Sequence, residues 1–490
     1  MKKTMIIRLI LFLVFISSGV IYSQSAAKTS EINEYLTSFN ALKKFNGTAL
    51  VAVGGKTIFK KGFGYANMEF KAPNAPETKM QLASITKTFT AVLVMKLIDE
   101  GKLTLETKIS DLLPWYKKEI GDKVTVRQLL NHSSGIKNYF TANGIKGPMK
   151  FAERIGITPI QLEEFGKNYC MESLDFEPGS QWAYNNSGYY LLAMIVEKLT
   201  GKPYARALKE MVLDPAGMKN SGDLAFIQPD VIPNMASGYM KGSNGYIRAP
   251  YWNMSTAYGA GSLFSTAEDL FLFDRALTRD DFISKKSRDE MFTLSIKNWG
   301  LGWELRDVPI GKDKKVKHVV THEGFLYAWH TRLYRIPEDN ICIVLLSNAG
   351  DAPLEVMFAG ITDILYGRKP EYPKKSAAEL FETEYRKSGI KKAVDKFNNI
   401  RNDKAAEYDF NEQDLNRLGY KMLPANPSDA AKLFKFIIDI YPNSSNAYDS
   451  YGEGLLASGD REGALKAYEK AVELNPKNSS SVEALKKLKN

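Results

Sequence analysis

The sequence contains three short stretches whose residue types and spacing suit nucleophilic catalysis. The first is Ser84-Ile85-Thr86-Lys87, which opens an apolar stretch with hydrophobic residues at helical spacing up to Gly101. On a helix, Lys87 lies one turn after Ser84 on the same face, and its amine can take the proton that keeps a hydroxyl a weak nucleophile. The N-terminus of a helix also favours negative charge. The motif therefore predicts a nucleophilic serine beside a base.

The Ser-x-x-Lys spacing is weak evidence by itself, because it recurs at Ser25, Ser134 and Ser388. Only the copy at Ser84 opens a long apolar helix. The competing interpretation is that Ser84 merely caps that helix. The two other stretches carry the residues that favour chemistry.

The second stretch, Tyr184-Asn185-Asn186, precedes an apolar helix expected at Tyr190–Leu199. In an extended segment, the side chains of Tyr184 and Asn186 point the same way. A phenol next to a lysine loses its proton more easily, and a carboxamide can donate to a substrate carbonyl while accepting from Lys87. The alternative is a turn aromatic followed by an asparagine cap.

The third stretch is His322-Glu323-Gly324-Phe325, which leads into a strand expected to run through Arg335. An imidazole at the edge of a strand can orient or protonate a reacting group. A serine, a lysine, a tyrosine and a histidine are thus the candidate catalytic residues of this chain.

Short secondary-structure elements must bring these stretches together. A Gly54-Gly55 pair between two strand-like runs predicts a hairpin. Residues 139–177 are polar and poorly periodic, which predicts a long excursion beside a cleft. The other expected elements are helices at Ser30–Phe45, Val124–Asn131 and Pro353–Tyr366, and strands at Gly47–Val53, Lys56–Gly62 and Ile341–Ser347.

The first 23 residues have the basic start, apolar middle and small end residues of a secretory signal peptide. We therefore expect an exported protein, periplasmic or secreted, with an uncleaved membrane anchor as the alternative. The net charge is +10, of which three charges belong to the leader. The remaining +7 is spread along the chain without basic runs that interleave aromatics, which argues against nucleic-acid binding. No later segment predicts a stable membrane span. The two cysteines fit no metal spacing, and no metal or organic cofactor is expected.

The chain changes character past Pro370, and we place a separate helical domain at residues 376–490. Small residues at Gly452 and Ala464 would let paired helices approach closely, as in tetratricopeptide repeats. A short solenoid of such repeats can bind a protein partner through its concave face. The repeat has a period of 34, because Ala430, Phe434, Ile440 and Pro442 recur as Ala464, Tyr468, Leu474 and Pro476.

Together, Ser84-x-x-Lys87, Tyr184-x-Asn186 and His322-x-Gly324 resemble the serine β-lactamase/DD-peptidase superfamily, in particular class C β-lactamases, D-alanyl-D-alanine carboxypeptidases and related esterases. The resemblance covers residues 30–367 and includes the supporting segments RQLLNHSSGI and STAEDL. It implies an α+β fold in which an antiparallel sheet has helices on both faces. A helical subdomain would meet the sheet at the active site.

The resemblance also implies roles for individual residues. Ser84 would be the acylated nucleophile, Lys87 its deprotonating partner, and Tyr184 the relay of a proton to the leaving group. Which of Lys87 and Tyr184 is the acylation base stays open. His322 would stand where many relatives carry lysine. Substrate binding would fall to Asn186, to Gly324 and Phe325, and to an oxyanion hole formed by the amides of Ser84 and Phe325.

Two residues depart from the family pattern. Relatives usually have threonine, serine or glycine at the position of Glu323 and a small residue at that of Phe325. A carboxylate would repel a substrate carboxylate, and a phenyl ring would narrow the cleft. Both departures favour an ester, a neutral amide or an amino-containing substrate over a β-lactam or a carboxypeptidase substrate. They also motivate the alternatives of a non-catalytic sensor and of a scaffold that binds cell-envelope partners through its repeats.

Overall fold

The computed structural model describes residues 26–157, 160–225, 231–242, 245–311 and 314–489. The chain forms two compact units, which divide between Tyr372 and Pro373. The expected signal peptide at residues 1–23 lies outside the described residues. Among the described residues, no helix combines the length and the apolarity that a membrane span requires.

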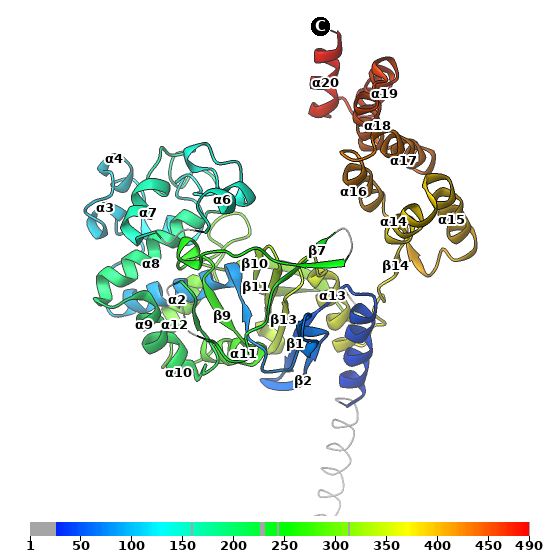
Figure 1. The fold of residues 1–490 in the computed structure, drawn as a ribbon. Coiled ribbons are helices and arrows are strands. Elements are labelled where there is room, and N and C mark those ends of the chain that lie inside the picture. Colours follow the sequence, from blue (N-terminus) through cyan, green and yellow to red (C-terminus); the bar gives the residue numbers. More distant parts are fainter. Residues whose placement is uncertain (1–25, 158–159, 226–230, 243–244, 312–313, 490) are drawn as a thin grey trace, which may run out of the picture. The chain divides into compact units, whose positions relative to one another are not determined.

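A six-stranded antiparallel sheet forms the centre of the first unit (Figure 1). The predicted hairpin at Gly54-Gly55 is confirmed, because β1 and β2 pair as neighbours and both glycines have positive φ. β1 pairs with β13 on its other side, so the first and last strands of the unit are adjacent. The strand order is β10 (Glu304–Ile310), β11 (Lys315–Leu326), β12 (Trp329–Ile336), β13 (Ile341–Ser347), β1 (Gly47–Val53) and β2 (Lys56–Phe63).

The predicted strand through Arg335 is present as β12, but the third stretch itself lies on a further strand, β11, which we did not predict. β11 ends at Leu326, and the chain turns at Tyr327 and Ala328 before β12 returns alongside it. Tyr327 adopts a left-handed conformation (φ 49°), an unusual one for a bulky residue, and the turn contains no glycine, asparagine or proline that would mark it in the sequence.

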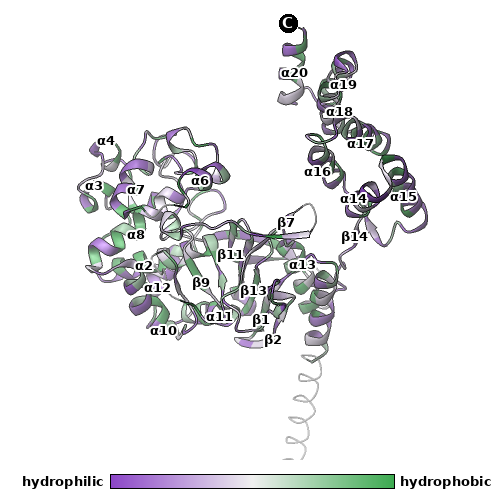
Figure 2. Ribbon diagram, viewed as in Figure 1, coloured by the Kyte–Doolittle hydropathy of each residue, from purple (hydrophilic) through white to green (hydrophobic). Residues whose placement is uncertain are grey.

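Helices cover both faces of the sheet, as expected. Alternate residues of β1 point to opposite faces: Ala49 and Val51 join one apolar core, and Leu50 and Ala52 join the other. The first core includes the helix at residues 26–41 and α13 (Leu354–Leu365). The second includes α2 (Thr86–Asp99), α8 (Asn186–Thr200) and α11 (Ala267–Ala276). Figure 2 shows the hydrophobic residues of the sheet between these layers.

The subdomain beyond α2 is helical. The predicted helix near 124–131 is present as α5 (Val126–Leu130), and Thr125 and Gln128 form a capping box at its start. The region 139–177 contains two helices that we did not predict, because they are short and mostly polar: α6 (Pro148–Arg154) and α7 (Leu162–Tyr169). The remaining short helices of the unit are α3 (Ile109–Leu112), α4 (Lys118–Gly121), α9 (Tyr204–Leu208), α10 (Asp214–Ala216) and α12 (Lys285–Met291).

The second unit consists mainly of antiparallel helices. The predicted close approach is confirmed, because a Cβ on Gly452 would lie 2.8 Å from the ring of Tyr468 on the next helix. Gly419 lies in the same way against Phe434. The helices are α14 (Ala377–Ser388), α15 (Ile390–Asp403), α16 (Glu412–Met422), α17 (Pro427–Ile440), α18 (Ser445–Ala457), α19 (Arg461–Leu474) and α20 (Ser479–Lys489).

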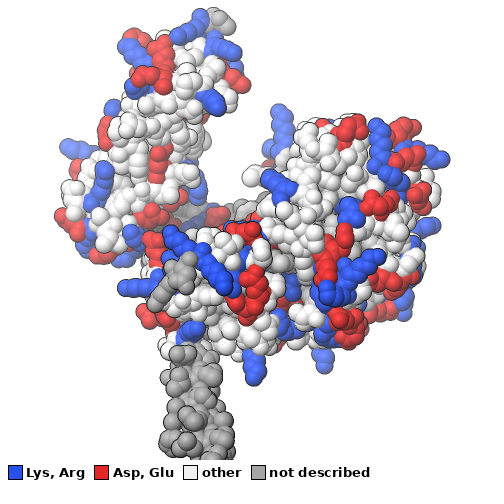
Figure 3. All heavy atoms as spheres, turned by 180° about the vertical axis from the view of Figure 1, so that it is seen from behind, with Lys and Arg blue, Asp and Glu red and all other residues white. Residues whose placement is uncertain are grey.

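Basic and acidic side chains are interspersed on the face of the molecule shown in Figure 3. Some charged residues of the described chain form ion pairs one helical turn apart, such as Lys435 with Asp439 and Lys466 with Glu462. Mixed charge of this kind keeps a surface soluble without creating a strong field of one sign.

Candidate active site

Ser84 lies at a tight junction between strand and helix. The short strand β5 (Met80–Gln81) leads through Leu82 into a 3₁₀ turn, Ala83–Ile85, which continues as α2. Ala83 has a φ of 47°, a conformation that non-glycine residues rarely adopt outside functional turns. Ser84 is half-buried and lines a cavity of about 730 Å³. Its hydroxyl is therefore both fixed by the fold and open to a ligand.

Lys87 is the best-connected residue of the site. Its Nζ lies 3.1 Å from Ser84 Oγ, 2.8 Å from Asn186 Oδ1 and 2.7 Å from the carbonyl oxygen of Ala260. The side chain is fully buried, and this burial lowers the pKa of Lys87 well below its usual value. The amine is thus poised as a base rather than as a fixed positive charge.

Asn186 is not in an extended segment, contrary to our prediction. It is the first residue of α8, which begins four residues earlier than expected, and Asn185 caps the helix by accepting from the amide of Gly188. The asparagine cap that we considered as an alternative therefore exists, but one residue earlier. Asn186 is left to contact Lys87.

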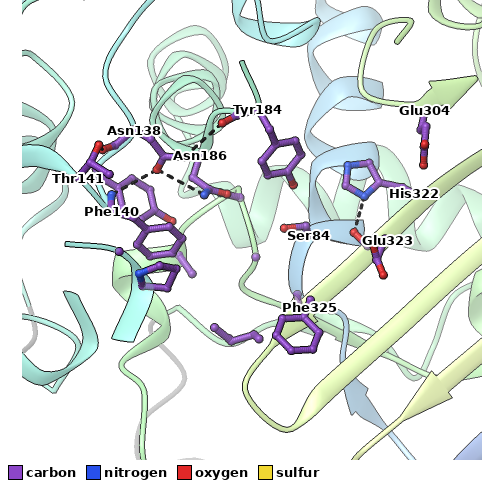
Figure 4. A pocket seen from close by; sticks show the side chains of 18 of the residues that line it. Ser84, Asn138, Phe140, Thr141, Tyr184, Asn186, Glu304, His322, Glu323 and Phe325 are labelled. Carbon is purple, nitrogen blue, oxygen red and sulfur yellow. Dashed lines mark hydrogen bonds between the residues drawn. The ribbon is translucent and has the colours of Figure 1, made fainter. Parts of the chain in front are cut away.

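Tyr184 still faces the same cavity as Asn186, and its side chain points toward Ser84 (Figure 4). Its hydroxyl lies within hydrogen-bond reach of Ser84. Lys87 Nζ lies 4.9 Å from the centre of the Tyr184 ring. We expected this lysine to favour the phenolate, but burial dominates and raises the pKa of Tyr184 well above its usual value. The hydroxyl therefore keeps its proton, within hydrogen-bond reach of Ser84.

His322 lies on β11 and is buried. Its Nδ1 is 2.7 Å from the carbonyl oxygen of Glu323, so Nδ1 must carry the proton and donate it. Nε2 is buried and has no hydrogen-bond partner in the structure. Burial, and then the charge of Lys87, lower the pKa of His322 to about 3. The imidazole is therefore an acceptor, and the protonating role that we considered is not supported.

Gly324 brings β11 against the turn that carries Ser84. A Cβ at this position would lie 2.0 Å from the carbonyl oxygen of Leu82 and 2.3 Å from Oγ1 of Thr331. Phe325 lines the cavity with 56% of its surface exposed, and its ring meets that of His330 edge to face. The phenyl ring thus forms part of the cavity wall, as we expected from its size.

The carboxylate of Glu323 is held by two partners. His330 Nε2 lies 2.6 Å from Oε1, and the guanidinium of Arg332 lies 3.4 Å from Oε2. The hydrogen bond from His330 is the largest cause that lowers the pKa of Glu323 below its usual value. This carboxylate, which also lines the cavity, is therefore ionised.

Several residues of the cavity were missed from the sequence. Asn138 links the two sides of the second motif, because its side chain contacts the carbonyl oxygen of Tyr184 and the amide of Asn186 (Figure 4). It follows the RQLLNHSSGI segment by two residues, which could have pointed to it. The aromatic lining comes from distant parts of the chain: Phe140, Trp182, Trp252 and Trp299.

His132 also belongs to this site, as a support. Its Nδ1 accepts from the amide of Asn185, and its ring lies 4.5 Å from that of Tyr184. The residue is buried, and these contacts hold the segment that carries Tyr184 in place. Within the described residues, no cluster of three or more histidine, cysteine, aspartate or glutamate residues is arranged to hold a metal ion.

Comparison with known proteins identifies the family to which this chain belongs. The Beta-lactamase family model matches residues 32–364. The chain belongs to the Beta-lactamase family. It is similar to "Penicillin-binding protein 4*" of Bacillus subtilis (strain 168), with 33% identity over 356 residues that cover 68% of this chain and 75% of the relative. As a member of this family, the chain is a serine hydrolase.

Two solved structures are similar to this chain in fold. The octameric penicillin-binding protein homologue of Pyrococcus abyssi has a TM-score of 0.58 and 27% identity, over 70% of this chain and 78% of that one. The D-amino acid amidase of Ochrobactrum anthropi SV3 has a TM-score of 0.57 and 24% identity, over 70% of this chain and 96% of that one. The second likeness shows the shared fold alone.

Proposed function

We propose that the chain hydrolyses an amide, peptide or ester through a covalent acyl-enzyme on Ser84. The observation that carries this proposal is the position of Ser84 Oγ between Lys87 Nζ and the Tyr184 hydroxyl, at the wall of a cavity. A nucleophile, a base and a proton donor within hydrogen-bond reach of one another are what acyl transfer requires.

Lys87 is the base that removes the proton of Ser84 in this proposal. A neutral amine has two N–H groups and one lone pair. Asn186 Oδ1 and the carbonyl oxygen of Ala260 are acceptors, and they take both N–H groups. The lone pair is then left for the hydroxyl of Ser84, at 3.1 Å. Tyr184 cannot be the base while its hydroxyl keeps its own proton.

The reaction then proceeds in two halves. Ser84 Oγ attacks the substrate carbonyl carbon as its proton moves to Lys87, and the negative charge on the carbonyl oxygen is stabilised by the amides of Ser84 and Phe325. The bond to the leaving nitrogen or oxygen breaks as Tyr184 donates its proton to that atom. Lys87 returns a proton to Tyr184, and water later attacks the ester and releases the acid. Asn186 orients Lys87 and offers its amide to the substrate.

We assign a separate role to each of the three parts of the chain. Residues 1–23 direct export and are removed, so that the mature enzyme acts in the periplasm or outside the cell. The hydrolase domain at residues 30–367 performs the chemistry. Tetratricopeptide repeats at residues 376–490 bind a protein partner. The helix pairs packed at Gly452 and Gly419 support the assignment of these residues to helical repeats.

Covalent labelling tests the proposal directly. The purified chain is incubated with a fluorophosphonate and with a fluorescent penicillin, and the labelled peptide is identified by mass spectrometry. We expect label on Ser84 and none in Ser84→Ala. Ser388→Ala, which changes another Ser-x-x-Lys serine, is the matched control and keeps the label. Labelling absent from Ser84 with both reagents would contradict the acyl-enzyme.

A turnover panel then separates the substrate classes. It contains nitrocefin, a D-Ala-D-Ala peptide, an aminoacyl anilide and a short-chain nitrophenyl ester. We expect the ester and the anilide to be hydrolysed faster than nitrocefin and the dipeptide, because Glu323 repels the carboxylate that the latter two carry.

A further inference from the structure

The wall of the cavity beside Ser84 presents hydrogen-bond acceptors. Nε2 of His322 is buried, carries a lone pair and has no partner, because Nδ1 already donates to the carbonyl oxygen of Glu323. The carboxylates of Glu323 and Glu304 line the same cavity (Figure 4). An unpartnered buried acceptor costs free energy unless a ligand supplies a donor.

The carboxylates of Glu304 and Glu323 share their cationic partners with Glu355. Arg332 pairs with Glu304 at 2.8 Å, with Glu323 at 3.4 Å and with Glu355 at 2.7 Å. Arg306 adds a second guanidinium, 2.8 Å from Glu355, and His330 Nε2 lies 2.6 Å from Glu323. Two of the three carboxylates, Glu304 and Glu323, line the cavity, whereas neither guanidinium group does. A ligand in the cavity therefore meets carboxylate oxygens on this wall.

Lys297 lines the cavity and the buried Lys87 contacts Ser84, but neither lysine offsets the charge of this wall. Lys87 is enclosed by Ser84, Asn186 and Ala260, and its burial disfavours the charged form. Lys297 is exposed, and its Nζ lies 4.0 Å over the ring of Trp182. A ligand at His322 and Glu323 thus meets acceptors, with aromatic rings on the remaining sides of the cavity.

We propose that the site selects substrates that carry a protonated amine next to the scissile carbonyl, with His322 Nε2 and Glu323 as the residues that hold the ammonium group. The substrate class is amides, esters and peptides of amino acids with a free amino group and an apolar side chain. The aromatic lining receives that side chain. An ammonium group supplies the donor that His322 Nε2 lacks and is attracted by the carboxylate of Glu323, whereas a substrate carboxylate would meet repulsion from both. This inference rests on the function proposed above.

The test compares three substrates that differ only at the amine. They are phenylalanine p-nitroanilide, its N-acetyl derivative, which is neutral, and its N-succinyl derivative, which carries a carboxylate, each as both enantiomers. We expect kcat/KM to fall by about tenfold or more from the free amine to the acetyl compound, and further to the succinyl compound. Equal or faster hydrolysis of the acetyl or succinyl compound would overturn the inference.

A pair of variants assigns the preference to the cavity wall. Glu323→Gln removes the charge in nearly the same shape, and the ratio of kcat/KM between the free amine and the acetyl compound should shrink by about tenfold. Glu355→Gln is the matched control, because Glu355 pairs with the same Arg332 but does not line the cavity. Glu355→Gln should leave the ratio of kcat/KM between the free amine and the acetyl compound unchanged. An unchanged ratio in Glu323→Gln contradicts the role of this residue.

A binding measurement separates this inference from the proposed hydrolysis. Phenethylammonium is titrated into the Ser84→Ala chain by calorimetry, with phenylpropionate as its anionic counterpart. We expect heat of binding from the ammonium compound alone. If Ser84 reacts with fluorophosphonate but the anion binds as tightly as the ammonium, the inference fails while the acyl-enzyme stands. If Ser84 does not react, the proposed function fails whichever compound binds.

Discussion

Gly324 of β11 packs directly against the carbonyl oxygen of Leu82, the residue two positions before Ser84. A Cβ at Gly324 would lie 2.0 Å from that oxygen, well inside van der Waals contact. The third motif is thus in physical contact with the turn that carries the nucleophile.

Gly324→Ala should therefore damage both the site and the fold. The methyl group must push β11 away from the turn, which we expect to lower kcat/KM by about 100-fold and the free energy of unfolding by about 1–3 kcal/mol. The measurements are ester hydrolysis and urea denaturation. Gly188→Ala is the control, because its Cβ would have no neighbour closer than 3.4 Å. A fully active Gly324→Ala chain would show that this contact does not position Ser84.

The pH dependence of ester hydrolysis reports on Lys87. Burial lowers the pKa of this amine, so it is protonated and inactive as a base only on the acid side of that value. We expect kcat/KM for a neutral nitrophenyl ester to rise with pH and to reach its plateau at a pH below the usual pKa of lysine. The value of kcat/KM should fall again only at high pH, because the pKa of Tyr184 is raised. An optimum that appears only near the usual pKa of lysine would contradict this assignment.

Lys87→Arg tests the same base by substitution. A guanidinium keeps its proton at every accessible pH, so we expect acylation to fall by about 100-fold or more. Fluorophosphonate labelling rates measure the change. Lys297→Arg, at the exposed edge of the cavity, serves as the comparison and should label at the normal rate.

Asp223 makes the stability of the first unit depend on pH. Its carboxyl is buried on the short strand β6 (Gly222–Asp223), and burial raises its pKa to about 7. In the unfolded chain the same group titrates near pH 4, at about 3.9. Between these values the folded chain binds more protons than the unfolded chain, so the free energy of unfolding falls as pH rises from about 4 to about 7.

Asp223→Asn should remove this loss of unfolding free energy at higher pH. We expect the Tm of the variant to exceed that of the natural chain increasingly from pH 5 to pH 8, with a gain of about 1–3 kcal/mol at pH 8. Scanning calorimetry at several pH values provides the measurement. Asp122→Asn, at an exposed position, should follow the natural chain. A constant difference between pH 5 and pH 8 would rule out titration of Asp223 as the cause.

Gly452→Ala should weaken the second unit. The added methyl would lie 2.8 Å from the ring of Tyr468, so α18 and α19 must separate slightly. We expect the helical signal of this unit to melt at lower urea, with a loss of about 1–2 kcal/mol. Leu456→Ala, which changes a partly exposed side chain of the same helix, is the control. If both variants melt alike, the close approach is not important for stability.

Local sequence patterns determined much of this protein. The i, i+3 spacing of Ser84 and Lys87 places both side chains on one helical face wherever the helix lies. The Gly54-Gly55 hairpin also follows from neighbouring residues, whose backbone preferences act over a few positions. The period of 34 in the C-terminal helices is read directly from the recurrence of residue types. The short helices α6 and α7 and the turn at Tyr327 carry no such signal.

Only the tertiary structure decided the chemistry of the site. Lys87 becomes a base because α8 and the segment around Ala260 enclose it, and His322 becomes an acceptor because β11 directs its Nδ1 proton to a backbone carbonyl. The ionised state of Glu323 depends on Arg332, which lies on the neighbouring strand. Burial and charge are properties of the space around a side chain. That space is built by residues far apart in the sequence, so the spacing of a motif cannot specify it.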